Sequence, residues 1–259
     1  MNLQTLAIEL VKIAEEAGKA ILKIYREAED FQTQSKKDAS PLTIADKTSN
    51  TIICQALEKL PDPYPIISEE NEIVDFSRRQ NWYRCWLVDP LDGTKEFINR
   101  NGDFTVNIAL VENHKVILGV VHIPVSNKTY YAITQQGAFQ ATDQSPIPLT
   151  TKAFSEEDAQ LIFLCSRSHL NEETKRFIDK FKDPIKVSRG SSLKFISIAE
   201  NEAHIYPRMA PTMEWDTAAA QIILEEAGGQ VVVAEDGSDM KYNKENLLNP
   251  YFIAYGKRH

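Results

Sequence analysis

Residues 86–94 combine an apolar run with two carboxylates that are suited to binding a divalent metal. Asp89 and Asp92 lie three residues apart at the end of the run, and Gly93 follows them directly. Glycine allows a tight turn that a side chain would hinder, and residues 95–97 can open a helix behind it. Two hard oxygen ligands beside a helix N-terminus favour a divalent cation together with a phosphate. For the Asp-Gly dipeptide alone, a strand that ends in an ordinary turn is the alternative.

Two further acidic positions lie where strands or helices are expected to begin or end. Glu69 opens an acidic cluster after a short apolar strand at residues 66–68, 20 residues before Asp89. The ends of two neighbouring strands can meet at one edge of a sheet, although such a cluster is also typical of a solvent-exposed loop. Asp216 follows Trp215 at the start of a long apolar stretch, where its local role could be helix capping, worth about 1 kcal/mol.

Apolar periodicity predicts the elements that position these residues in the first half of the chain. Amphipathic helices are expected over residues 3–28 and from residue 41 to a proline-rich stop near residue 61, with Thr43 and Asp46 spaced as a capping box. Residues 32–40 are polar and are expected to form a loop. The expected strands lie at residues 66–68, 103–112, 116–123, 129–134 and 137–140. This run of strands favours an antiparallel or mixed sheet over a Rossmann alternation.

The second half of the chain alternates strands and helices after a polar joint at residues 143–157. The expected strands lie at residues 161–165, 185–188, 203–206, 231–234 and 252–255. The expected helices lie at residues 172–181, 191–199 and 216–227. The pattern therefore predicts two halves, of approximately residues 1–150 and 151–259, with a layered second half.

The composition is that of a soluble globular protein, with 42% hydrophobic and 25% charged residues in a chain of 259. A formal net charge of -8 excludes a broad basic face for nucleic acid, so an anionic substrate would need metal ions or a local cationic pocket. Cys54, Cys85 and Cys165 are scattered among apolar neighbours, which indicates buried free thiols in a reducing compartment. Without a signal peptide or a membrane-length apolar run, we expect a cytoplasmic protein. Peripheral attachment to the inner face of the cell membrane stays open.

Two segments resemble the signature motifs of the inositol monophosphatase superfamily, the lithium-sensitive magnesium phosphatases. Asp-Pro-Leu-Asp-Gly-Thr follows Trp-Leu-Val at residues 86–94, and Trp215-Asp216 is followed by small residues and by Gly228-Gly229. The resemblance covers essentially the whole chain. It implies one domain over residues 1–259, with an α+β fold built as a layered αβαβα sandwich.

The resemblance also implies the roles of individual residues. Asp46 and Thr94 would orient and deprotonate the attacking water, while Gly93 and Thr94 would offer N–H groups to the phosphate. Glu69 and Asp216 would border the substrate as well as the metals. The implied ligands of two or three Mg²⁺ ions are Glu69, Asp89, Asp92 and Asp216 through their side chains and Leu91 through its backbone carbonyl.

The second half resembles, in finer detail, the 3'(2'),5'-bisphosphate nucleotidases of the bacterial CysQ type. Gly-Ser-Ser-Leu-Lys-Phe at residues 190–195 and Tyr-Pro-Arg at residues 206–208 carry this resemblance. Inositol monophosphatases typically have an acid about seven residues before the last metal aspartate, where this chain has Met209. An arginine beside that position suits a second phosphate better than a polyol. The implied substrate contacts are His169, Ser191, Lys194 and Arg208.

These features predict a Mg²⁺-dependent phosphomonoesterase. Metal-activated water would hydrolyse the 3'-phosphate of 3'-phosphoadenosine 5'-phosphate, giving AMP and phosphate and clearing a by-product of sulfate assimilation. The first alternative is an inositol-1-monophosphatase or another sugar monophosphatase, and a more distant one is a non-catalytic metal- or nucleotide-binding protein. The sequence does not distinguish a monomer from a homodimer.

Overall fold

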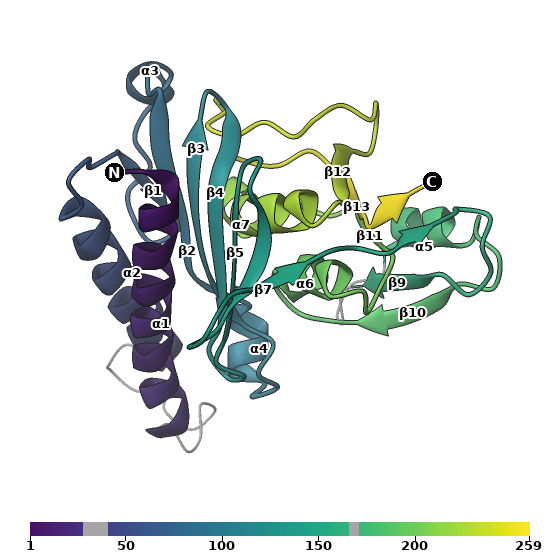
Figure 1. Ribbon diagram of the computed structural model, residues 1–259, viewed down its shortest axis with the longest axis horizontal. Coiled ribbons are helices and arrows are strands. Elements are labelled where there is room, and N and C mark those ends of the chain that lie inside the picture. Colours follow the sequence, from purple (N-terminus) through teal and green to yellow (C-terminus); the bar gives the residue numbers. More distant parts are fainter. Residues whose placement is uncertain (28–40, 166–170) are drawn as a thin grey trace.

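The computed structural model describes residues 1–27, 41–165 and 171–259, which form five layers of helices and sheets (Figure 1). A pair of long helices covers a seven-stranded sheet, and a second pair of helices separates that sheet from a five-stranded one. A short helix covers the far side of the second sheet. This order confirms the predicted αβαβα sandwich.

The outermost helices are α1 (Leu3–Glu27) and α2 (Pro41–Glu58), as the periodicity predicted. Their apolar faces pack in one core cluster with side chains from the near face of the first sheet. The burial of α1 follows the helical period of three to four residues, which makes the helix amphipathic. Its fully buried positions include Leu10, Ala14, Ala17 and Ile21.

The seven-stranded sheet is mixed, as expected, with the strands in sequence order. β1 (Ile66–Ser68) runs parallel to β2 (Arg84–Asp92), and the connection between them contains the short helix α3 (Phe76–Arg79). All later neighbours pair antiparallel: β3 (Thr105–Glu112), β4 (Lys115–Ile123), β5 (Lys128–Ile133), β6 (Gly137–Ala141) and β7 (Ile147–Leu149). β7 falls inside the segment that was predicted to be a polar joint, so the first sheet extends further along the chain than the pattern indicated.

The second sheet has the order β10-β9-β11-β13-β12. Its strands are β9 (Ile162–Cys165), β10 (Ile185–Ser188), β11 (Ile205–Arg208), β12 (Gln230–Val233) and β13 (Phe252–Tyr255). α5 (Glu172–Ile178) covers its outer face, while β8 (Ala153–Phe154) and β14 (Lys257–Arg258) form a separate parallel pair. The predicted alternation of strands and helices is confirmed, with boundaries that shift by at most three residues.

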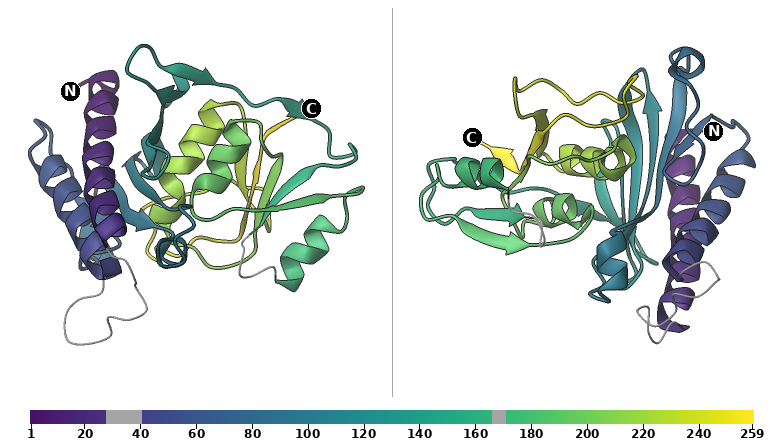
Figure 2. Two further views of the ribbon diagram at one scale, coloured as in Figure 1. Left: turned by 90° about the horizontal axis from the view of Figure 1, so that it is seen from below. Right: turned by 180° about the vertical axis from the view of Figure 1, so that it is seen from behind.

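Helices α6 (Leu193–Ala199) and α7 (Glu214–Glu226) form the central layer, seen from behind in Figure 2. α7 is buried around most of its circumference because it packs between two sheets. Gly119 of β4 allows this close packing, since a Cβ atom there would lie 2.6 Å from the Ala219 carbonyl oxygen. The helix that carries Asp216 is therefore held directly against the sheet that carries Asp89 and Asp92.

The predictions for the cysteines and for membrane-spanning helices can be compared with the structure. Cys54, Cys85 and Cys165 are all free thiols, as expected, but Cys54 is only half-buried. Within the three ranges that the structure describes, every helix is too short or too polar for a membrane crossing.

Candidate active site

Parallel pairing of β1 with β2 brings the first two acidic residues together. Ser68, the last residue of β1, lies opposite Val88 in the register, so the next residues, Glu69 and Asp89, lie side by side. The Glu69 N–H continues the pairing by donating to the Val88 carbonyl at 3.2 Å. Glu69 and Asp89, 20 residues apart in the sequence, are thus direct neighbours in the structure.

A β-bulge in β2 places Asp89 and Asp92 on one face of the sheet. Asp89 lies opposite Asn107 and Asp92 opposite Thr105, so an interval of three residues on β2 faces an interval of two on β3. In a regular strand, residues three apart point to opposite faces. The extra residue in the bulge removes this mismatch. The Ser49 hydroxyl donates to the Pro90 carbonyl inside the bulge at 2.7 Å, which holds the bulge against α2.

Gly93 makes the turn that follows the two aspartates. It has φ 101° in the left-handed region, and a Cβ atom there would lie 3.0 Å from the Asp103 carbonyl oxygen. Helix α4 (Thr94–Ile98) begins at the next residue, which confirms the predicted turn and helix. Leu91, between the aspartates, donates its N–H to Asp89 Oδ1 at 3.1 Å and buries its side chain in the core under α1 and α2.

Asp216 joins the cluster from the first turn of α7. The helix begins at Glu214 with Met213 as its N-cap, so Asp216 is the third helical residue and not the cap itself. Its Oδ2 accepts the Met213 N–H at 2.9 Å, which orients the carboxylate. The closest carboxylate oxygens of Glu69, Asp89 and Asp216 all lie within 4.8 Å of one another. Three distant parts of the chain therefore supply one acidic cluster.

The cluster shifts the pKa values of its own carboxyl groups. Burial, followed by repulsion from Asp92, Glu69 and Asp216, raises the pKa of Asp89 well above its usual range. Burial and then Asp92 raise the pKa of Asp216 to about 7, and burial raises that of Glu69. Oxygen donors that are desolvated and repel one another are suited to a hard divalent cation, whose charge would offset the repulsion. The residues present thus fit the predicted metal site.

Asp46 lies beside this cluster, inside α2. Because α2 begins at Pro41, Thr43 is already within the helix, and the predicted capping box of Thr43 and Asp46 is wrong. Burial, then the charges of Glu70 and Glu69, raise the pKa of Asp46 to about 7. α2 contacts α4, which begins with the exposed Thr94. Among the described residues, Asp46 and Thr94 share no hydrogen bond.

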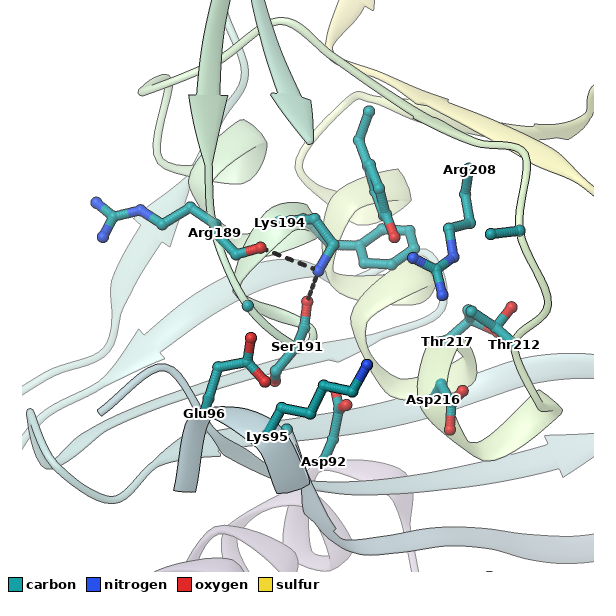
Figure 3. Close-up of a pocket in the computed structure, with 15 residues that line it drawn as sticks. Asp92, Lys95, Glu96, Arg189, Ser191, Lys194, Arg208, Thr212, Asp216 and Thr217 are labelled. Carbon is teal, nitrogen blue, oxygen red and sulfur yellow. Dashed lines mark hydrogen bonds between the residues drawn. The ribbon is translucent and has the colours of Figure 1, made fainter. Parts of the chain in front are cut away.

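A cavity of about 220 Å³ opens next to the acidic cluster, with walls from both halves of the chain. Figure 3 shows Asp92 and Asp216 on one side and the cationic groups of Lys194 and Arg208 across from them. Lys95 reaches over Asp92 from α4, while the side chain of Arg189 points away from the cavity (Figure 3). The cavity therefore combines a metal-binding side with an anion-binding side.

Lys194 is buried at the cavity wall and is held by backbone carbonyls. Its Nζ donates to the carbonyls of Ser191 at 2.7 Å and Arg189 at 3.4 Å, and it lies 5.2 Å from the centre of the Tyr206 ring (Figure 3). Burial lowers its pKa to about 8, so the ammonium form still predominates at neutral pH. Arg208 donates from Nη2 to the Pro211 carbonyl at 3.0 Å, but its buried Nε has no partner among the described residues. Both cations have donors left for an anion.

The structure does not describe one of the predicted substrate contacts, and it places Met209 away from the cavity. His169, with the adjoining Ser166–Ser168 segment, lies outside the described residues. Met209 does not line the cavity. It contributes to a groove between α5 and the edge of the second sheet, together with Phe177 and Tyr251.

The sequence reasoning missed a second set of buried polar residues at the start of α7. Glu214 is fully buried and accepts the Asn243 and Lys244 N–H groups at 2.5 and 3.0 Å, and Lys244 Nζ lies 2.5 Å from it. Arg79 of α3 donates to Asn243 Oδ1 at 2.9 Å, which extends the network to the connection between β1 and β2. No local pattern could reveal Glu214, since its partners follow about thirty residues later.

Comparison with known proteins gives a consistent picture. The model of the inositol monophosphatase family matches residues 2–255. The 3'(2'),5'-bisphosphate nucleotidase CysQ of Salmonella typhimurium is 40% identical over 246 residues, covering 94% of this chain and 97% of that protein. The CysQ crystal structure from Bacteroides thetaiotaomicron has 40% identity and a TM-score of 0.87, covering 99% of this chain and 98% of that one. An Anabaena inositol monophosphatase, with 22% identity, a TM-score of 0.74 and coverage of 99% and 92%, shares the fold.

Proposed function

The chain belongs to the inositol monophosphatase family, and we propose that it hydrolyses the 3'-phosphate of 3'-phosphoadenosine 5'-phosphate to AMP and phosphate. It is a phosphoric monoester hydrolase, like the 3'(2'),5'-bisphosphate nucleotidases to which it is 40% identical. The observation that carries the substrate proposal is the cavity with carboxylates on one wall and Lys194 and Arg208 on the other. A substrate with two phosphate groups can use both walls at once.

The 3'-phosphate would bind at the acidic wall. We propose that Glu69, Asp89, Asp92 and Asp216, with the Leu91 carbonyl, hold two or three Mg²⁺ ions. When bound, these ions would neutralise charge on the phosphate and lower the pKa of water. The N–H groups of Gly93 and Thr94 at the start of α4 would orient the phosphate oxygens.

Asp46 and Thr94 would move the proton of the attacking water. The Thr94 hydroxyl accepts this proton as it passes its own to the Asp46 carboxylate. A carboxyl group with a pKa of about 7 suits this role, because general bases work best when their pKa lies near the working pH. The hydrogen bond between the two residues would form when the substrate is bound, since catalytic contacts often tighten only in the complex.

The 5'-phosphate would bind at the cationic wall. Lys194 supplies a buried ammonium group, and Arg208 supplies a planar fork whose Nε has no partner within the part of the chain that the structure describes. Ser191 would contact the nucleotide from the same side, and His169, which lies outside the described residues, would be a further contact. An inositol monophosphate lacks a second anionic group and would leave this wall unused.

The biological setting follows from the reaction. Removal of 3'-phosphoadenosine 5'-phosphate would clear a by-product of sulfate assimilation, and lithium would inhibit by competing at the magnesium site. We further propose a cytoplasmic enzyme in which residues 1–259 form a single domain, with the metal ligands mainly in residues 1–150 and the nucleotide contacts in residues 151–259.

The test is phosphate release from the bisphosphate nucleotide and from inositol 1-phosphate, with and without Mg²⁺. Arg208→Ala should raise KM for the nucleotide roughly 10- to 100-fold, the value of a charge-assisted hydrogen bond of about 1.5–3 kcal/mol. It should leave turnover of inositol 1-phosphate unchanged. Arg189→Ala is the matched control, because that side chain points away from the cavity and pairs with Glu202. Equal rates on both substrates, or equal effects of the two arginine variants, would refute the nucleotide assignment.

A further inference from the structure

One oxygen of the Asp92 carboxylate is held by donors from both halves of the chain. Asp92 Oδ2 accepts the backbone N–H of Ser192 at 2.7 Å. The side-chain amide of Asn107, from β3, approaches the same oxygen at 3.4 Å. Because both contacts converge on Oδ2, the other oxygen of Asp92 is left to face the cavity.

The hydroxyl of Ser192 connects this carboxylate to the last acidic residue of the cluster. Ser192 Oγ donates to the backbone carbonyl of Asp216 at 2.9 Å and accepts from Asn107 Nδ2 at 3.0 Å. A single serine before α6 therefore contacts the segments that carry Asp92 and Asp216.

A second hydroxyl fixes the orientation of the Asn107 amide. Thr105 Oγ1 donates to Asn107 Oδ1 at 3.0 Å, so the NH₂ group of Asn107 must face Asp92 and Ser192. Ser191 Oγ lies 2.7 Å from Thr105 Oγ1 and completes the chain of hydrogen bonds. Thr105, Asn107 and Ser192 are at most 1% exposed. Buried networks in which every group is satisfied are rigid, and losing one member leaves the others unpaired.

The backbone around Ser192 is also pressed against the first half of the chain. Ser191 has φ 49°, a left-handed conformation that side chains rarely adopt. The Gly190 N–H donates to Asp103 Oδ2 at 3.2 Å, and a Cβ atom on Gly190 would lie 2.5 Å from Glu96 Cγ. A segment kept in an unfavourable conformation at a functional site is over-determined by its surroundings. Here those surroundings include Asp103 and Glu96 from the first half of the chain.

We propose that Asn107 and Ser192 are positioning residues that set the orientation of the Asp92 carboxylate and its spacing to Asp216, and thereby the metal affinity of the site. The inference rests on the proposed role of Asp92 and Asp216 as metal ligands. Carboxylate ligands are themselves commonly hydrogen-bonded, and such partners tune metal affinity. Neutral donors are suited to this role, because a lysine or arginine at the same place would cancel the charge that the cation needs.

The test measures Mg²⁺ binding by calorimetry on the full chain without substrate. Ser192→Ala and Asn107→Leu should each raise the Mg²⁺ dissociation constant about tenfold or more. Ser192→Thr, which keeps the hydroxyl, should restore most of the affinity. Ser197→Ala is the matched control, because this buried serine of α6 donates to Glu202 and not to the acidic cluster. With the nucleotide, the two affected variants should lower kcat at a fixed Mg²⁺ concentration and leave KM nearly unchanged.

The increase in melting temperature on adding Mg²⁺ separates positioning from simple stabilisation. Positioning predicts a smaller increase for Ser192→Ala and Asn107→Leu than for the wild type. Variants that melt earlier but bind Mg²⁺ with the wild-type dissociation constant would overturn the proposal. Failure of the wild-type protein to bind Mg²⁺ would overturn it together with the metal assignment. A wild type that binds Mg²⁺ but does not hydrolyse the nucleotide would overturn the proposed function alone.

Discussion

The first turn of α7 carries two carboxylates, Glu214 and Asp216, whose surroundings are opposite. Glu214 is fully buried, but Lys244 and two backbone N–H groups lie against it. Asp216 faces mainly other acids, and Asp92 and Glu69 both raise its pKa. A single turn of helix therefore carries one carboxylate that the protein neutralises and one that it leaves to be neutralised by another group.

This difference separates a structural role from a binding role better than burial alone. A buried ion pair needs no external group, and breaking it is costly because one charge is left unpaired. A buried cluster of like charges is unfavourable in the protein alone, and a bound cation would offset its repulsion. Substitutions on the two sides of this turn should therefore affect stability and activity in opposite ways.

The largest effect is expected at Asp216. Asp216→Asn keeps the shape of the side chain and its bond to the Met213 N–H, but removes one charge from the proposed metal site. Loss of metal assistance worth several kcal/mol should lower phosphate release more than about 10³-fold. The protein without Mg²⁺ should be as stable as the wild type or more stable, because like-charge repulsion decreases. The measurements are the rate of phosphate release and the melting temperature in chelator.

Two outcomes would contradict this prediction. A rate within tenfold of the wild type would remove Asp216 from the metal ligands. A much lower melting temperature in chelator would show that Asp216, like Glu214, is a structural residue, and the contrast between the two would disappear.

The next effect is expected at the partner of Glu214. Lys244→Met leaves a buried carboxylate with only backbone donors, which should lower the free energy of unfolding by about 3 kcal/mol. Turnover below the melting temperature should stay within a few-fold of the wild type. Urea unfolding and initial rates provide the measurements. Adding Glu214→Leu to Lys244→Met should recover stability, because replacing a whole buried pair by apolar residues is often neutral. A double variant that is less stable than Lys244→Met would argue against this account of the pair.

The same contrast explains what could be predicted from the sequence. Asp89, Asp92 and Asp216 lie in short contiguous motifs, and Glu69 follows a strand whose pattern is clear. The β-bulge that turns Asp89 and Asp92 to one face depends on the pairing of β2 with β3, which no single segment specifies. Most elements followed from periodicity because apolar spacing is a local property, whereas the αβαβα sandwich was implied by the family resemblance.

Residues that act through distant partners could not be predicted in this way. Glu214 differs from an ordinary first-turn acid only because Lys244 and Asn243 reach it in the folded chain. Asn107 is one polar residue in a buried strand, and Ser192 is one of two adjacent serines, so neither stands out before β3 and the start of α6 meet. The capping box at Thr43 failed for a related reason, since the helix extends back to Pro41.

His122 is a third buried titratable residue and, unlike Glu214 and Asp216, it is a histidine that stays uncharged in the folded chain. His122 of β4 is 1% exposed, and burial, followed by the charge of Lys19, lowers its pKa to about 4. Its Nδ1 lies 2.9 Å from Thr129 Oγ1, and that hydroxyl donates to Glu15 Oε1 at 3.0 Å. Because the hydroxyl proton goes to Glu15, Thr129 must accept from Nδ1–H, which selects a neutral tautomer.

The smallest predicted effect is the pH dependence that this histidine adds to stability. The unfolded chain binds the His122 proton near pH 6.5, whereas the folded chain binds it only near pH 4, so stability falls as the pH drops through that window. A difference of this size corresponds to about 3 kcal/mol. His122→Asn can keep a donor for Thr129 without titrating. Between pH 6.5 and 4, its free energy of unfolding should therefore fall by about 3 kcal/mol less than that of the wild type. Parallel unfolding free energies for the two proteins across this range would show that the pKa of His122 is the same in the folded and unfolded chains.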